Sequence, residues 1–173
     1  MANHFSQLAK KSRTNGSSEK IAKEQTGKPS LDIYKLGDDV LRQNSKRITK
    51  VDESIRKLAR EMLQSMYAAK GIGLAAPQIG INKELLVIDV NFEDSAAEPL
   101  ILINPEITDF GTTLNSYEEG CLSIPGVYLN VVRPSTIKLK FRDEMGRPRK
   151  MKADGLLARC IQHEMDHLNG ILF

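Results

Sequence analysis

The spacing of the apolar residues changes twice along the chain, and this limits the folds open to it. From Asp52 to Lys70 apolar residues recur every three or four positions, which predicts an amphipathic helix with Asp52 as its N-cap. Short apolar runs at 85–90 and 100–103 predict strands. A second helical pattern fills 154–170. Because one helix precedes the strands and another follows them, rather than alternating with them, we expect an α+β fold.

An antiparallel hairpin is predicted between the last strands. Apolar and basic residues alternate over 137–142, as in a strand with one buried face. Residues 142–147, which include Gly146, supply a turn before a second short strand at 150–153.

Charged residues are unevenly divided along the chain, which excludes two classes of function. Residues 1–29 hold six of the 25 basic and two of the 22 acidic side chains, so they carry +4 and the rest carries −1. Residues 30–173 are therefore nearly neutral and lack the cationic face that binding to a phosphate backbone requires, so no direct nucleic-acid function is expected. No apolar stretch approaches the roughly 20 residues that cross a bilayer, so no membrane span is expected.

Residues 1–29 predict a flexible N-terminal extension, because their few apolar residues show no periodicity. A targeting peptide is the alternative, since the first residues are basic and no acid precedes Glu19. Arg is scarce there, which favours a plain extension and a cytoplasmic protein over an organellar one. With only Cys121 and Cys160, the chain is expected in a reducing compartment. Residues 30–173 are expected to form one domain.

The second helical pattern contains His163-Glu164-Met165-Asp166-His167, a match to HExxH. One helical turn separates the two imidazoles, so both can bind one metal ion. The Glu164 carboxylate lies beside them, where it can exchange protons with a metal-bound water as general base and acid. A solvated helix face with histidines placed by chance is the alternative. It is disfavoured because two of the three histidines in the chain share one face with Leu156 and Cys160.

Two histidines leave a catalytic metal site incomplete, because such an ion usually keeps about three protein ligands and a water. The candidates for the third ligand are Cys160, Cys121, Glu118 and Glu119. Cys160 lies on the apolar helix face, where a cysteine usually fills the core. Cys121 lies in a short apolar stretch with glycines and a proline at its margins, typical of a turn or strand end that presents a thiolate. The residues alone leave this choice open.

A third segment, Gly-Ile-Gly-Leu-Ala-Ala-Pro-Gln-Ile-Gly at 71–80, is rich in small residues that let another backbone approach closely. Alone, this pattern is typical of a packing loop. Together with the other two motifs, it predicts a segment that pairs with an extended peptide and offers the Gln78 amide to a developing oxyanion.

These three segments resemble, in order and spacing, the signature motifs of the peptide deformylases: GIGLAAPQIG at 71–80, EEGCLSIPG at 118–126 and QHEMDHLNG at 162–170. The resemblance extends from Leu31 to Phe173, and Gly126-Val127-Tyr128 is similar to the bacterial and plastid type-1B branch. It implies one catalytic domain over 30–173, with antiparallel sheets packed around a central C-terminal helix that carries HExxH.

The resemblance also implies a role for each motif residue. Cys121, His163 and His167 would bind the metal, with Glu164 as general base and acid. Gln78 and the backbone N–H of Leu122 would donate to the oxyanion. The residues implied in substrate binding are Gly71, Ile72, Gly73, Gly120, Tyr128, Leu156 and Cys160, of which Ile72, Leu156 and Cys160, with His163, would line the methionine pocket. Glu119 and Arg133 would form a supporting ion pair.

The implied enzyme is a hydrolase that removes the formyl group from N-formylmethionine of newly synthesised polypeptides and releases formate. A metal-bound hydroxide would attack the formyl carbon. The resemblance implies Fe(II) in cells, and the ligand set also accepts Zn, Ni or Co. The expected partners are N-formylmethionyl nascent peptides, and association with the ribosome stays open.

Two other classes of protein are alternatives. An HExxH metallopeptidase would use a downstream Glu or His as third ligand, but none follows His167. A non-catalytic module stabilised by metal would surround the ion with four protein ligands and leave no open position.

Overall fold

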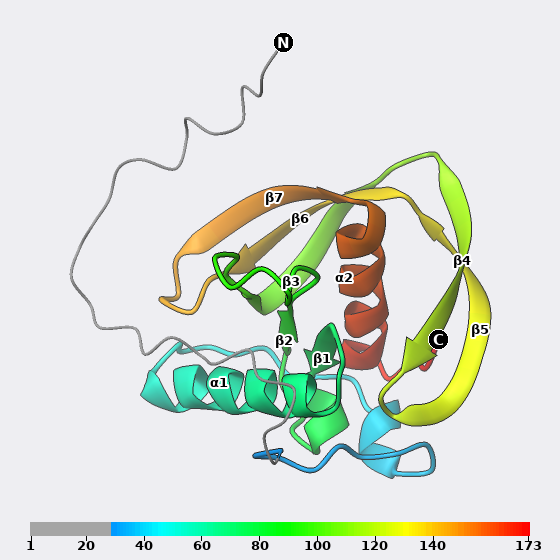
Figure 1. Ribbon diagram of the computed structural model, residues 1–173. Coiled ribbons are helices and arrows are strands. Elements are labelled where there is room, and N and C mark those ends of the chain that lie inside the picture. The colour runs from blue at the N-terminus through cyan, green and yellow to red at the C-terminus, as the bar shows by residue number, and fades with distance from the viewer. Residues whose placement is uncertain (1–28) are drawn as a thin grey trace.

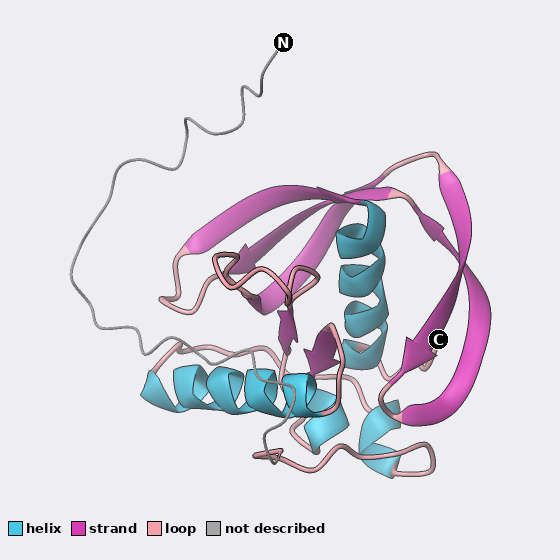
Figure 2. Ribbon diagram, in the orientation of Figure 1, coloured by secondary structure: helices cyan, strands magenta, loops and turns pink. Residues whose placement is uncertain are grey.

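The order of elements is the one that the apolar spacing predicts: a helix, a run of strands and a second helix (Figure 2). The structure is a computed structural model that describes residues 29–173, so the expected extension at 1–29 lies outside the described residues apart from Pro29. The helices are α1 (Glu53–Ala68) and α2 (Gly155–Leu168), with short 3-10 turns at Asp39–Arg42 and Ala76–Ile79. The strands are β1 (Gly73–Ala75), β2 (Leu85–Ile88), β3 (Leu100–Phe110), β4 (Leu114–Cys121), β5 (Ile124–Pro134), β6 (Thr136–Arg142) and β7 (Pro148–Asp154).

The strands form two antiparallel sheets with α2 standing between them (Figure 1). One sheet has the order β1-β2-β3-β6-β7, and the other is the β4-β5 hairpin. The predicted hairpin over 137–153 is confirmed as β6 and β7, which pair Leu139 with Met151. The expected α+β fold, with antiparallel sheets around the C-terminal helix, is therefore confirmed.

Helices α1 and α2 cover opposite faces of the five-stranded sheet, and β2 shows this most clearly. Leu85 and Val87 of β2 belong to the core that α1 buries, whereas Leu86 and Ile88 belong to the core that α2 buries. A strand buried on both faces is apolar throughout, which explains the continuous apolar run in the sequence. Packing against this sheet holds α2 in place between the five-stranded sheet and the β4-β5 hairpin.

The two predicted helix starts differ in the structure. The Asp52 carboxylate accepts hydrogen bonds from the backbone N–H groups of Ser54 and Ile55, so it caps α1 as predicted. Asp154 is the N-cap residue of α2, but its side chain makes no capping hydrogen bond. Asp154 is still paired in β7, and Gly155, with φ of +53°, makes the sharp turn into α2.

The β4-β5 hairpin was not expected from the sequence. Most of its side chains are exposed on both faces, so apolar and polar residues do not alternate as they do in a half-buried strand. Cys121 ends β4, in keeping with the expected strand end, and a register shift separates it from Gly120.

Within residues 29–173, no helix is long and apolar enough to span a membrane.

Candidate active site

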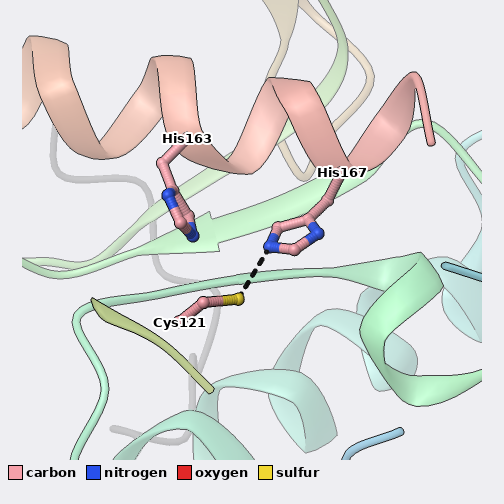
Figure 3. A group of neighbouring side chains, drawn as sticks. All are labelled: Cys121, His163 and His167. Atoms are coloured by element: carbon pink, nitrogen blue, oxygen red, sulfur yellow. Dashed lines mark hydrogen bonds between the residues drawn. The ribbon is translucent and has the colours of Figure 1, made fainter. Parts of the chain in front are cut away.

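Three buried side chains of the types that bind metal ions meet where the hairpin contacts α2 (Figure 3). Cys121 comes from the end of β4, and His163 and His167 come from successive turns of α2. Their ligand atoms all lie within 4.8 Å of one another, and the Cys121 Sγ is 3.2 Å from the His167 Nε2. Of the candidates that the sequence left open, Cys121 is the one grouped with both histidines among the described residues.

Glu119 orients the His163 ring. The His163 Nδ1 lies 3.0 Å from the Glu119 Oε2, and a carboxylate accepts there, so Nδ1 carries a proton and Nε2 is the ring nitrogen available to a metal ion. The predicted Glu119–Arg133 pair is also present, with the Arg133 Nε 2.7 Å from the Glu119 Oε1. Burial alone would raise the pKa of Glu119, but hydrogen bonds from His163, Arg133 and Arg159 hold it at about 2.

The donor atoms fit a divalent cation. Burial and the charges of His163 and Arg133 lower the pKa of His167 to about 3, which keeps its imidazole neutral as a ligand must be. Burial opposes protonation of His163, yet Cys121 and Glu119 outweigh it and raise its pKa to about 10. A positive charge is therefore favoured at this ring, and a metal ion would supply it by displacing the proton on Nε2. The buried Glu164 Oε2 and His167 Nδ1 have no hydrogen-bond partner among the described residues. A thiol and two imidazoles suit Fe(II), Zn, Ni or Co.

Glu164 is buried next to these ligands and carries an unusual pKa. Burial raises the pKa of its carboxyl to about 7, and the negative charge of Glu119 also contributes. A carboxyl with a pKa near neutrality can accept a proton and return it at physiological pH. A carboxyl with this position and pKa could serve as a general base and acid.

The Gln78 amide is turned toward Cys121 by a contact with the backbone. Its Oε1 accepts a hydrogen bond from the Ala75 N–H at 2.8 Å. Its Nε2 therefore faces the other way, 3.2 Å from the Ser123 Oγ and 3.8 Å from the Cys121 Sγ. Leu122 follows Cys121 in the turn, where the Lys35 ammonium donates to the Leu122 carbonyl oxygen at 2.8 Å. Gln78 can therefore donate to a negative charge that develops next to Cys121.

A cavity of about 650 Å³ opens onto these groups. It is lined by Gln78, Cys121, His163 and Glu164, and by every residue that the resemblance implies in substrate binding: Gly71, Ile72, Gly73, Gly120, Tyr128, Leu156 and Cys160. Cys160 also belongs to the buried core, as expected. Leu156 is 49% exposed, so it forms a rim of the cavity rather than a part of the core.

One wall of the cavity is a free sheet edge. Within residues 29–173, β1 is the outermost strand of its sheet, paired with β2 on one side only. An extended peptide can add to such an edge through main-chain hydrogen bonds. Gly73 leaves room for the groups behind it, because a Cβ at this position would lie 2.7 Å from the Cys160 Sγ and closer still to the Glu164 Oε1.

We expect Gly73→Ala to lower kcat/KM by about tenfold, a change of about 1.4 kcal/mol, because the added methyl group displaces Glu164. Gly71→Ala is the comparison, because Gly71 lies on the same proposed peptide-binding edge, but a Cβ there meets the flexible end of the Leu122 side chain rather than Glu164, so kcat should be retained. The comparison comes from kcat and KM of the two variants, measured by steady-state hydrolysis of a formylated peptide. An equal loss in both variants would contradict the displacement of Glu164.

Three contributors to the site were not expected from the sequence. Arg159 donates to the Glu119 Oε1 at 2.6 Å, Ser123 contacts Gln78, and Lys35 contacts Leu122. The Asp166 Oδ2 lies 2.7 Å from the Arg133 Nη1. Only Arg159 carried a signal, as a basic residue one helical turn before His163 on a largely apolar helix.

Comparison with known proteins agrees with this arrangement. The family model for polypeptide deformylases matches residues 30–173. A peptide deformylase of Prochlorococcus marinus strain AS9601 is 98% identical over 173 residues, which are 100% of this chain and 86% of that protein. A peptide deformylase of Synechococcus sp. strain CC9605 is 63% identical over 173 residues, again 100% of this chain and 86% of that protein.

Solved structures show the same fold. A crystal structure of a peptide deformylase from Synechococcus elongatus in complex with actinonin has a TM-score of 0.88 and 58% identity, and covers 90% of this chain and 85% of that chain. The plant peptide deformylase PDF1B has a TM-score of 0.80 and 41% identity, over 83% of this chain and 78% of that chain. The resemblance of the three sequence motifs is thereby confirmed. The chain belongs to the peptide deformylase family, the hydrolases that remove N-formyl groups from nascent peptides.

Proposed function

We propose that this chain removes the formyl group from N-formylmethionine with the help of a divalent metal ion held by Cys121, His163 and His167. The observation that carries the proposal is the meeting of these three donors with Glu164 and Gln78 on one cavity beside a free sheet edge. When bound, the metal supplies a Lewis acid that polarises the formyl carbonyl and activates water. The ion proposed for the cell is Fe(II), and Zn, Ni or Co also suit the ligands.

Proton transfer is assigned to Glu164. Its carboxylate takes a proton from the attacking water and delivers it to the amine nitrogen of methionine as the bond to the formyl carbon breaks. The products are formate and a free N-terminus. The buried Glu164 Oε2, which has no partner within the described residues, supports this role.

Charge on the formyl oxygen is stabilised by two donors. The Gln78 Nε2 and the backbone N–H of Leu122 donate hydrogen bonds to the oxygen as it becomes negative. Because Ala75 holds the Gln78 Oε1, the donor group needs no reorientation during the reaction. Such donors are most effective when they are aligned in advance.

Substrate orientation follows from the walls of the cavity. The peptide backbone adds to the sheet edge along Gly71–Gly73, where β1 begins, and Gly120 and Tyr128 also line the cavity. The methionine side chain enters between Ile72, Leu156 and Cys160, where burial of such a side chain contributes roughly 1.5–3 kcal/mol. The enzyme is proposed to act in the cytoplasm, on newly synthesised polypeptides.

Formate release from a formylmethionyl tripeptide tests the proposed function. We expect hydrolysis with Fe(II), Ni(II) or Co(II), loss of hydrolysis after chelation, and recovery when the metal is restored. A tripeptide that carries an acetyl group in place of the formyl group is the control, because the added methyl group occupies space next to the reacting carbon. Cleavage of internal peptide bonds without release of formate would instead identify a metallopeptidase.

Air exposure is expected to separate the iron form from the nickel form. Fe(II) and the Cys121 thiolate that binds it are both open to oxidation, whereas Ni(II) resists it. The iron form should therefore lose activity in air faster than the nickel form, as measured by residual formate release over time. Equal decay of freshly loaded iron and nickel forms would contradict this explanation.

A further inference from the structure

The attachment of the β4-β5 hairpin to α2 determines the geometry of the proposed metal site. Cys121 and Glu119 belong to the hairpin, whereas His163 and His167 belong to α2. The hairpin is a sheet of its own, with no strand pairing to the five-stranded sheet among the described residues. An isolated two-stranded hairpin is marginally stable, so contacts with the rest of the domain help to hold it in position. One is the hydrogen bond from the Leu36 N–H to the Ser123 carbonyl oxygen, and the others include side-chain contacts from α2.

Three polar side chains on one stripe of α2 make these contacts. Arg159, Gln162 and Asp166 follow one another at intervals of three and four residues, which places them on the same side of the helix. The Gln162 Nε2 donates to the Pro134 carbonyl oxygen at 3.0 Å, and Asp166 binds Arg133. Both of these contacts are with residues of β5.

Arg159 reaches both strands of the hairpin. Its Nη2 donates to the Asn115 carbonyl oxygen in β4 at 2.7 Å, and its Nη1 donates to the Val131 carbonyl oxygen in β5 at 3.0 Å. The guanidinium also lies 5.6 Å from the ring centroid of Tyr117, which lines the cavity. The planar fork of an arginine spreads its donors over three nitrogens in a fixed geometry, whereas a lysine ammonium has all of its donors on one nitrogen.

The same guanidinium completes the hydrogen bonding of Glu119. The Glu119 Oε1 accepts from the Arg133 Nε at 2.7 Å and from the Arg159 Nη1 at 2.6 Å. The Glu119 Oε2 accepts from the Arg133 Nη2 and from the His163 Nδ1, each at 3.0 Å. A carboxylate offers about four acceptor positions, so all of them are used. With side chains only 6% and 11% exposed, Glu119 and Arg159 interact with little screening by water.

We propose that Arg159 is a positioning residue for the reaction: it joins both hairpin strands and Glu119 to α2, and so sets the position of Cys121 relative to His163 and His167. The inference rests on the proposed function, in which these three residues hold the metal. Among the described residues Arg159 has no hydrogen bond to Cys121, His163 or His167, so it acts on them through Glu119 and the hairpin, although it also lines the cavity.

Two substitutions at this position test the role. Arg159→Leu removes every donor, and Arg159→Lys keeps the charge but only one nitrogen. Arg149→Leu is the matched control, because the Arg149 ion pair with Asp143 is at the β6-β7 end of the protein, where no proposed site residue lies. For each variant, we would measure the absorption spectrum of the Co(II) form, the Kd for Co(II) by competition with a chelator, and kcat and KM for a formylmethionyl tripeptide.

Arg159→Leu is expected to bind Co(II) 10- to 100-fold more weakly, to change the cobalt spectrum, and to lower kcat more than it raises KM. Arg159→Lys should recover part of each loss, and the control should match the wild type. If Arg159→Leu melts at a lower temperature but keeps the wild-type spectrum, Kd and kcat, the residue only packs the hairpin and the inference is wrong. If Arg159→Leu does not fold, a wild-type spectrum and Kd in Arg159→Lys overturn the inference equally.

The wild-type measurements separate this inference from the proposed function. A wild-type protein that binds no Co(II) and releases no formate refutes the proposed function. A wild-type protein that does both, together with unaffected Arg159 variants, refutes only the positioning role.

Discussion

Replacement of Glu164 by glutamine is expected to lower kcat by at least roughly 100-fold while the metal stays bound. Glutamine has nearly the same shape but cannot accept and return a proton. Glu164 is not among the three grouped ligands, so its charge is not needed to hold the ion. The measurements are kcat for formate release and metal content per chain.

Glu118→Gln is the matched control for this substitution, because Glu118 is an exposed carboxylate that also lines the cavity. We expect kcat within a few-fold of the wild type for it, since an exposed charge at the cavity mouth contributes little. Near-normal turnover by Glu164→Gln would remove Glu164 from the mechanism. Loss of metal in that variant would instead make Glu164 a ligand.

Cys121→Ser is expected to lose most of its bound metal and nearly all activity. A serine hydroxyl stays protonated at neutral pH, whereas a thiol near a metal ion is readily deprotonated and binds it as thiolate. The short distance from the Cys121 Sγ to the His167 Nε2, 3.2 Å, places this sulfur within the ligand group. Metal content after dialysis, and formate release with and without added Fe(II), provide the measurements.

Cys160→Ala is the natural comparison, because the chain has only these two cysteines and both are buried. Cys160 packs in the core and its Sγ lies 3.7 Å from the Ile72 carbonyl oxygen, so its loss should cost roughly 1 kcal/mol of unfolding free energy. Metal content should stay at the wild-type level. Full metal in Cys121→Ser and none in Cys160→Ala would reverse the two assignments.

Features within one helix or one strand were predictable from the sequence. The α-helix places residues four positions apart on one face, so His163 and His167 had to be neighbours once α2 formed. The cap at Asp52 is equally local, because the two N–H groups that it accepts from belong to Ser54 and Ile55, within one turn of it. The apolar run of β2 predicted a strand because burial on both faces leaves no place for polar side chains.

Tertiary structure decided what joins the hairpin to α2. The candidates for the third ligand were Cys121, Cys160, Glu118 and Glu119, and which of them is grouped with both histidines depends on how β4 packs against α2. Because β4 is largely exposed on both faces, its sequence has no strand periodicity that could predict this packing. The partners of Arg159 are equally remote in the chain, at Asn115, Glu119 and Val131. Local geometry determines neighbours within a turn, whereas contacts between distant segments depend on the packing of the whole domain, which no short pattern records.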